Sequence, residues 1–153
     1  MILALISDTH GFLRESALRA LRGAGLILHA GDVGDAAILE ELGKLAPVVA
    51  VRGNVDTAAW AEAQPVTAVA NAGSKKIYLL HDVHQLAVNP AASGYSIVLS
   101  GHSHKPGQME RDGVLYINPG SAGPRRFNLP ITVARLDLER QPWKAEFIDV
   151  SQP

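Results

Sequence analysis

Short apolar runs, each followed by side chains that can bind a metal ion, recur five times along the 153-residue chain. Runs of this length between polar turns are typical of strands in a buried sheet. The runs and the side chains after them are Ile2–Ile6 with Asp8 and His10, Leu26–Leu28 with Asp32, Val48–Val51 with Asn54, Ile77–Leu80 with His81, and Ile97–Leu99 with His102 and His104. If these runs form one sheet, the side chains collect at its carboxyl edge, where open α/β sheets bind ligands. The pattern predicts a site for two metal ions.

The first third of the chain alternates apolar runs with amphipathic stretches. Strands are expected at 2–7, 26–29 and 47–51, and helices at 13–22 and 36–45. Gly23 ends the first helix, and Asp35 can cap the amino end of the second. This order predicts a parallel βαβαβ beginning.

The remainder consists of short β runs with turn residues between them. Strands are expected at 66–70, 76–80, 107–111, 114–117, 131–138 and 144–150. Asn71-Ala72-Gly73 and Asp112-Gly113 are the expected hairpin turns. These strands predict a second, largely antiparallel sheet packed on the first. We therefore expect an α/β fold, a two-sheet β sandwich flanked by helices, in a single domain spanning residues 1–153.

Composition restricts the partners. The net charge of −1 lacks the basic excess of proteins that grip nucleic acid, so nucleic acid is disfavoured. The absence of cysteine leaves oxygen and imidazole nitrogen as the metal ligands and fits a reducing cytoplasm. The opening run lacks the basic flank of a signal peptide, and the longest uncharged stretch, between Asp82 and Lys105, contains Pro90 and Gly94. We expect a cytoplasmic protein with no membrane span.

Each candidate ligand, taken singly, has an ordinary alternative use. Asp8 could cap a helix starting near Phe12, Asp32 could begin a turn, and a histidine at a strand end often only makes a hydrogen bond. These alternatives would have to apply independently at five strand ends. The joint pattern therefore favours the metal site.

Spacing suggests how the ligands divide between two ions. In extended backbone, residues two apart direct their side chains to one side, as expected for Asp8 with His10 and for His102 with His104. One ion would be held by Asp8, His10 and one histidine of the 102/104 pair, and the other by Asn54, His81 and the remaining histidine, with Asp32 as the bridge. Mixed oxygen and nitrogen ligation favours Mn²⁺, with Zn²⁺, Fe, Co²⁺ or Ni²⁺ as alternatives, over Ca²⁺ or Mg²⁺.

These motifs, in this order, resemble those of the calcineurin-like metallophosphoesterase superfamily. The motifs are Asp8-Thr9-His10, Gly31-Asp32, Gly53-Asn54-Val55-Asp56, His81 and Gly101-His102-Ser103-His104. Asn118-Pro119-Gly120-Ser121 followed by Pro124-Arg125 is similar to the small YfcE-like phosphodiesterase branch. The resemblance spans roughly residues 1–126.

The resemblance implies roles for individual residues. The first ion would be held by Asp8, His10, Asp32 and His104, and the second by Asp32, Asn54, His81 and His102. The implied reaction is hydrolysis of a small phosphate ester, most simply a phosphodiester, by attack of a metal-bridging hydroxide on phosphorus. Asp32, Asn54 and His81 are the expected catalytic residues. Asn54 and Arg52 would contact substrate, although solvent exposure is the ordinary state of an arginine, and Asp56, Asp82 and His29 would support the ligands.

Two positions depart from the family pattern. Many relatives have a histidine where this chain has Val55, and there it protonates or steadies the leaving group. Many have glycine after the histidine of the fifth motif, where this chain has Asp82. Asp82 could orient an imidazole or narrow the phosphate pocket. The loss of the histidine favours substrates with good leaving groups.

A protein of another class is the main alternative. The family includes a retromer subunit of this fold that works as a non-catalytic protein-binding scaffold. In such a scaffold ligands should be missing, yet all seven predicted ligand positions here hold a metal-compatible residue. We therefore favour the enzyme. Exposed antiparallel edges could support a homodimer.

Overall fold

The expected βαβαβ unit is present, in the computed structural model that describes residues 1–152. Its elements are β1 (Ile2–Ile6), α1 (Glu15–Leu21), β2 (Leu26–His29), α2 (Ala36–Gly43) and β3 (Val48–Ala50). The three strands pair in parallel, with Leu5 opposite Leu28 and Leu28 opposite Val49. The Asp35 carboxylate accepts a hydrogen bond from Ala37 N at 2.9 Å, which confirms the expected helix cap.

The second sheet is mixed. Its strands are β4 (Thr67–Ala72), β5 (Lys75–Leu80), β6 (Ile97–Leu99), β7 (Gly107–Arg111) and β8 (Val114–Asn118), in the order β4-β5-β6-β8-β7. β5, β6 and β8 are parallel, and only the outer strands pair antiparallel. The prediction of a largely antiparallel sheet is therefore wrong at its centre, because the long connection before β6 crosses over instead of forming a hairpin.

The two predicted hairpins are present, but one turn lies elsewhere. Asp112 and Gly113 join β7 to β8 with φ angles of 52° and 78°, as a two-residue turn between right-twisted strands requires. Asn71 and Ala72, predicted to lie in a turn, instead belong to β4. Gly73 and Ser74 make that turn, because β4 pairs with β5 up to Ala72 opposite Lys75.

The last two strands join the first sheet. β9 (Thr132–Asp137) pairs antiparallel with β1, and β10 (Glu146–Asp149) with β9, giving the order β10-β9-β1-β2-β3. The expectation that they extend the second sheet is wrong, and so is the placement of all five ligand-bearing runs in one sheet. Alternating hydrophobicity identifies a strand but not its partner.

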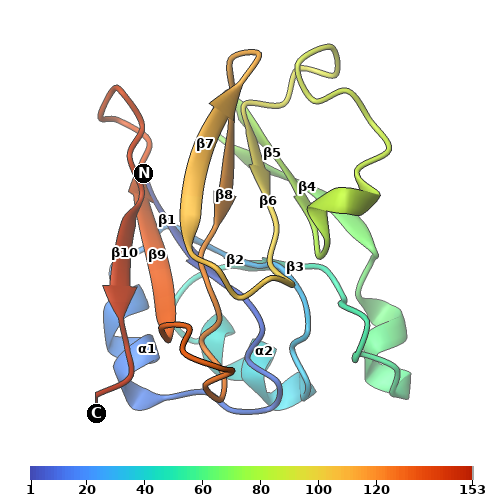
Figure 1. Cartoon of the computed structure of the whole chain (residues 1–153), viewed down its shortest axis with the longest axis vertical. Coiled ribbons are helices and arrows are strands. Elements are labelled where there is room, and N and C mark those ends of the chain that lie inside the picture. The colour runs from blue at the N-terminus through green and yellow to red at the C-terminus, as the bar shows by residue number, and fades with distance from the viewer. Residues whose placement is uncertain (153) are drawn as a thin grey trace.

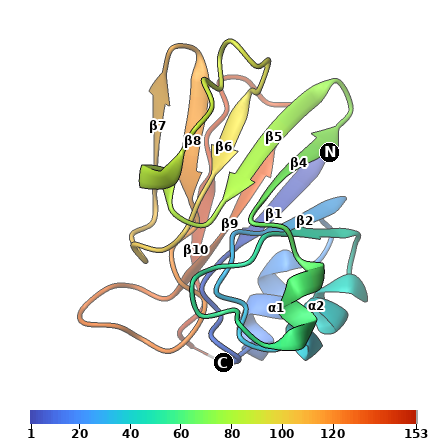
Figure 2. The ribbon, with the colours of Figure 1, turned by 90° about the vertical axis from the view of Figure 1, so that its right-hand side faces the viewer.

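The two sheets pack face to face, and α1 and α2 cover the outer face of the first (Figures 1 and 2). Successive β1 residues serve different layers: Leu3 and Leu5 lie in the core between the sheets, and Ala4 and Ile6 lie under the helices. The two-sheet sandwich with helices is thus confirmed. None of the helices within residues 1–152 is long and apolar enough to cross a lipid bilayer.

The outer face of the second sheet carries a small apolar cluster. Tyr78, Leu80 and Val98 are buried there against Leu86 and Tyr95. This cover comes from the connection between β5 and β6, which contains the short 3-10 helix η2 (Val83–Gln85). A second such helix, η1 (Ala59–Ala63), follows β3.

Candidate metal centre

The predicted ligands lie at the carboxyl ends of parallel strands from both sheets. Asp8 and Asp32 follow β1 and β2 of the first sheet, and His81 and His104 follow β5 and β6 of the second. The parallel strands of both sheets end at the same end of the sandwich (Figure 1). Side chains about 50 to 100 positions apart in sequence therefore meet across the seam between the sheets.

Asp8 lies at the centre of this group. Its Oδ1 atom is 3.2 Å from His104 Nε2, 3.7 Å from His10 Nε2 and 3.8 Å from His81 Nε2. Its other oxygen, Oδ2, accepts hydrogen bonds from Ser7 Oγ at 2.7 Å and from His102 N at 3.1 Å. One carboxylate oxygen is thus held by the protein, and the other faces three imidazoles.

Asp32 contacts two of the same imidazoles. Its Oδ2 atom lies 3.1 Å from His81 Nε2 and 3.6 Å from His10 Nε2, while Oδ1 accepts a hydrogen bond from Val55 N. His81 Nδ1 lies 2.8 Å from the Ala30 carbonyl oxygen, and the proton of that hydrogen bond must be on Nδ1. His81 therefore presents Nε2 to the carboxylates.

Two groups of side chains place their ligand atoms close enough to hold an ion. One is Asp8, His10 and His104, and the other is Asp8, Asp32 and His81. Asp8 is common to both, whereas the sequence suggested Asp32 as the bridge; Asp32 Oδ2 nevertheless lies near both His10 and His81. Neither group includes His102, whose ring packs edge-on against His81 with centroids 5.2 Å apart. Asn54 is exposed beside the same residues.

The backbone at these residues is in an unusual conformation. Five of the seven predicted ligands have left-handed φ angles between 48° and 69°: Asp8, His10, Asp32, His102 and His104. The expected extended backbone at Asp8 and His10 and at His102 and His104 is therefore wrong, because each pair lies in a turn beyond its strand. A left-handed non-glycine residue costs about 1–3 kcal/mol, and such residues cluster at functional sites.

Buried atoms without partners also gather here. Within residues 1–152, five buried side-chain nitrogen or oxygen atoms lack a hydrogen bond, and four of them belong to this cluster: Asp8 Oδ1, His10 Nε2, His81 Nε2 and His104 Nδ1. Leaving such an atom unpaired costs about 1–3 kcal/mol. Carboxylate oxygens and imidazole nitrogens in one buried cluster fit a divalent transition-metal ion.

The charges are coupled. Burial would raise the pKa of Asp8, but the neighbouring imidazoles of His10 and His104 hold it far below its ordinary value. Burial would also raise the pKa of Asp32, but the contact with His81 outweighs it and the pKa is lowered. Contact with Asp8 raises the pKa of His10, and contact with Asp32 raises the pKa of His81 against the effect of burial. Both carboxylates are therefore ionised at neutral pH and can bind cations.

His29 and Asp56 hold the loops that carry the ligands. His29 Nδ1 accepts a hydrogen bond from Gly31 N, its Nε2 lies 3.0 Å from Thr9 Oγ1, and burial lowers its pKa to about 4. Asp56 accepts hydrogen bonds from the backbone N–H groups of Val33, Gly34 and Gly53. His29 thus connects the Asp8 loop to the Asp32 loop, and Asp56 connects the Asp32 loop to the Asn54 loop.

A cavity of about 350 Å³ opens beside the cluster. Its lining includes the predicted ligands Asn54, His81 and His102, the apolar residues Val66 and Leu80, and the polar residues Arg52, Thr67, Asp82 and Gln85. Arg52, expected to be solvent-exposed, is half-buried and lines this cavity. Asp82 Oδ2 lies 3.9 Å from His102 Nε2, and Oδ1 accepts hydrogen bonds from His84. Asp82 therefore both faces an imidazole and borders the cavity.

The sequence reasoning missed several residues that support the cluster. Ser7 donates to Asp8, Ser121 Oγ donates to the Asp8 carbonyl oxygen, and Asn118 Nδ2 donates to Gly101 O and Ser103 Oγ. At Gly101 a methyl group would collide with Ser7 Oγ and Asp8 Oδ2. Asn118 and Ser121 belong to the Asn118-Pro119-Gly120-Ser121 motif, and that motif is the only feature of the sequence that could have pointed to them.

Comparison with known proteins agrees with this geometry. Residues 1–141 match the calcineurin-like phosphoesterase superfamily domain. A probable metallophosphoesterase of Methanothermobacter thermautotrophicus is 34% identical over 100% of this chain and 95% of its own length.

Solved structures share the fold. One is a novel archaeal phosphodiesterase, with a TM-score of 0.80 and 24% identity over 97% of this chain and 100% of that one. Another is YfcE, a phosphoesterase from E. coli, with a TM-score of 0.74 and 23% identity over 99% of this chain and 94% of that one. A third is Vps29 of Entamoeba histolytica complexed with Zn²⁺, with a TM-score of 0.75 and 23% identity over 99% of this chain and 100% of that one. With two sheets whose strand ends carry the family's motifs, this chain belongs to the calcineurin-like phosphoesterase superfamily.

Proposed function

We propose that the protein is a phosphodiesterase that uses two divalent metal ions, with Mn²⁺ favoured. One observation carries the proposal: Asp8 Oδ1, a buried oxygen without a hydrogen bond, lies within 3.8 Å of three imidazole nitrogens. The imidazole contacts stabilise the Asp8 carboxylate only in part, because Asp8 Oδ1 and three imidazole nitrogens of the cluster still lack a hydrogen bond. The arrangement is what binding of cations requires.

The proposed ligands divide into two sets. Asp8, His10, Asp32 and His104 would hold the first ion, and Asp32, Asn54, His81 and His102 the second. Such ions supply Lewis acidity, which lowers the pKa of water and offsets negative charge on a phosphoryl group. His81 is fixed for this task because its Nδ1–H is bound by the Ala30 carbonyl.

The remaining residues would bind and orient the substrate. Asn54 and Arg52 line the cavity beside His81 and offer an amide and a guanidinium to phosphate oxygens. The apolar side chains of Val66 and Leu80 in the same lining suit a small organic ester group. These features support a small phosphate ester as the substrate.

Val55 leaves the site without a histidine acid at that position, and its backbone N–H is already bound to Asp32. The leaving group therefore has to depart without a proton from this side chain, so the rate should fall steeply as the leaving-group pKa rises. A series of aryl phosphodiesters measures this slope. Val55→His should flatten it, since a positioned general acid contributes about 10²–10⁴-fold. A flat slope in the wild type would contradict this role of Val55.

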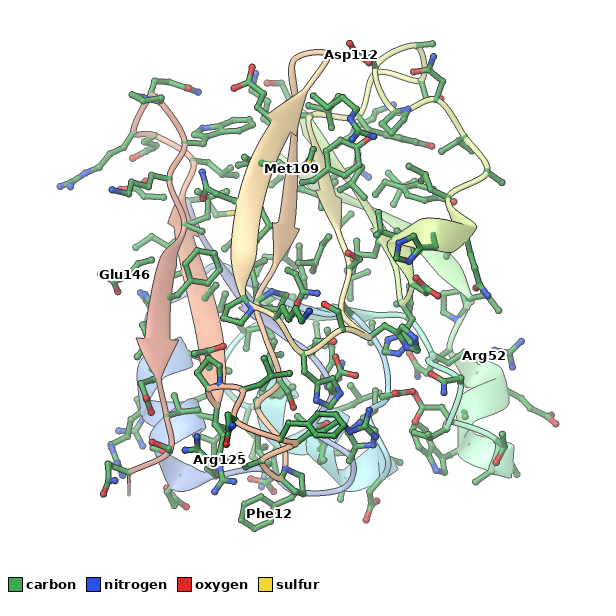
Figure 3. All side chains as sticks on the ribbon, in the orientation of Figure 1. Phe12, Arg52, Met109, Asp112, Arg125 and Glu146 are labelled. Carbon is green, nitrogen blue, oxygen red and sulfur yellow. The ribbon has the colours of Figure 1, made fainter. Side chains whose placement is uncertain are left out.

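The first experiment measures hydrolysis of bis(p-nitrophenyl) phosphate beside p-nitrophenyl phosphate in added Mn²⁺. Asp32→Asn should abolish turnover of the diester. Asp112→Asn makes the same chemical change in the β7–β8 turn at the far end of the molecule and should retain it (Figure 3). Equal rates in wild type and Asp32→Asn would refute the proposal.

A protein-binding scaffold is the second candidate, and the fold shared with Vps29 is the observation that favours it. The two candidates differ in what they need from the ligand cluster. An enzyme needs Asp8 and Asp32 to be ionised and accessible to metal ions, whereas a scaffold needs only a folded surface. Mn²⁺ binding without turnover of any phosphate ester would favour the scaffold.

A further inference from the structure

Another cavity, of about 460 Å³, lies between two segments of the chain, one of which contains the predicted ligand His104. Ser103 and Lys105 line one wall, and Arg126, Phe127, Asn128 and Leu129 line the other. We call the second wall the 126–129 turn.

Both walls are tied to segments that carry predicted ligands. Lys105 directly follows His104, and Asn118 Nδ2 donates to Ser103 Oγ at 3.1 Å. The stem of the 126–129 turn is fixed to the other side of the centre, because Ala122 N donates to the Ser7 carbonyl and Ser121 Oγ to the Asp8 carbonyl. The cavity therefore has a fixed position relative to the metal centre.

Phe127 has no structural partner that explains its position. It is 85% exposed, the highest value among the large exposed apolar residues of the described chain, and its φ angle is 55°. A bulky residue in this left-handed region is a true outlier, and outliers of this kind point to function. Leu129 N bonds to Arg126 O, and Arg125 Nη1 bonds to Leu129 O, so the turn is closed on itself with the ring outside.

The charge around this ring has one sign. Arg126 and Lys105 line the cavity, Arg125 adjoins it, and no acidic residue lines it. In a chain of net charge −1 this is a local basic surface, not part of a general excess.

An exposed aromatic ring with two flanking cations is suited to a ligand with a flat face and a negative charge. The ring can stack on the face, and the cations can bind the anion. We propose that this cavity binds the distal part of the substrate, and that this part is a nucleotide unit: an aromatic base on Phe127 and a phosphate on Arg126 and Lys105. The proposal rests on the phosphodiesterase function, because the cavity adjoins the metal centre.

Binding can be measured without metal, which separates this cavity from the reaction. The full chain is treated with chelator and titrated with AMP, ribose 5-phosphate and adenosine, following affinity by calorimetry and the amide shifts of residues 126–129 by NMR. AMP should bind at least about tenfold more tightly than either fragment, since stacking and charge each contribute. Phe127→Ala should lower AMP affinity about tenfold. Phe12→Ala, which removes an exposed ring beside Arg14 on another loop, should not.

Turnover gives the second readout. Phe127→Ala should reduce kcat/KM for thymidine 3′-phosphate 5′-(p-nitrophenyl phosphate), whose 3′-phosphate is separate from the scissile one, about tenfold more than for methyl p-nitrophenyl phosphate, mainly through KM. AMP and ribose 5-phosphate binding equally, or Phe127→Ala acting equally on both esters, would overturn the nucleotide assignment. A loop that instead binds phosphatidylserine vesicles through Phe127, without AMP binding, would also overturn it.

The two proposals fail in different ways. Wild-type protein that cleaves the methyl ester but does not distinguish AMP from ribose 5-phosphate keeps the proposed function and loses this inference. Wild-type protein that binds AMP at residues 126–129 but cleaves neither ester loses the proposed function and keeps a nucleotide site.

Discussion

The candidate metal centre has a buried half and an exposed half, and the two are built differently. The side chains of Asp8, His104, Asp32 and His81 are between 0% and 8% exposed. His102 is 46% exposed, and Asn54 is also exposed. In the buried half, Ser7 and the Ala30 carbonyl hold the ligands in place. Packing and hydrogen bonds therefore hold the side chains of the buried half in place. The side chains of the exposed half are open to solvent.

The largest expected effect comes from breaking the buried half at Asp8. Asp8→Asn removes the charge that both ligand groups share. We expect loss of both ions and a fall of about 10³-fold or more in kcat/KM, since a bound ion supplies several kcal/mol. Metal content after dialysis, with diester turnover, measures this. Retention of one tightly bound ion would contradict the central place of Asp8.

A second change tests whether the buried half is rigid. A methyl group at Gly101 would collide with Ser7 Oγ and Asp8 Oδ2, so Gly101→Ala should lower the free energy of unfolding by about 1–3 kcal/mol. Gly43→Ala, at the end of α2 with open space around it, should raise it by up to about 1 kcal/mol. Urea denaturation compares the two. If both substitutions changed the free energy of unfolding equally, the side chains around Gly101 would be able to move aside at little cost, and the buried half would not be rigid.

In the exposed half, Asn54→Ala should separate binding from folding. Asn54 makes no side-chain hydrogen bond within the described residues, so unfolding should change by less than about 0.5 kcal/mol. The affinity for the second ion should fall about tenfold, a loss typical of a weakened metal site. Calorimetric titration with Mn²⁺ resolves the two ions. A large loss of stability would show that Asn54 also supports the fold.

The smallest effect is the pH dependence of stability without metal. His10 and His81 have raised pKa values, so their stabilisation is complete below the ordinary value of 6.5 and is lost as pH rises above it. His29, with a pKa of about 4, acts oppositely: its contribution is lost as pH falls from 6.5 toward 4. Asp8 and Asp32, with lowered pKa values, lose theirs only below the ordinary 3.8.

Stability of the metal-free chain should therefore be greatest near pH 6.5. Adding Mn²⁺ should reverse the decline above that value, because a metal competes with protons for the imidazoles. Thermal unfolding from pH 5 to 8, with and without Mn²⁺, tests both trends. A decline that Mn²⁺ leaves unchanged would argue against imidazole ligation.

Local patterns predicted the elements well and their long-range arrangement less well. The Asp35 cap and the Asp112-Gly113 turn depend on neighbouring residues, and both are present. The position of β9 depends on pairing with β1, more than 120 residues away in sequence, which alternation does not specify, and β10 then pairs with β9.

The candidate site divides in the same way. Asp8, His10, Asp32, His81 and His104 could be selected from their positions after apolar runs, and the fold brings them together. Their role as ligands stays a prediction. The left-handed backbone at Asp8 and the hydrogen bond from Ser7 could not be predicted from the sequence, because both depend on the conformation of the loop after β1, where Asp8 N bonds to the Gly31 carbonyl oxygen.

The meeting of two sheets at the metal centre has a consequence for folding. Asp8 and Asp32 belong to one sheet, and His81 and His104 to the other, so neither sheet alone presents a complete set. An ion that binds this set binds only the closed sandwich, and it stabilises that state by RT ln(1 + [ion]/Kd). Contacts this distant in sequence also form slowly. If the proposed ions bind, the concentration of free metal is therefore expected to set how stably the two sheets stay packed on each other.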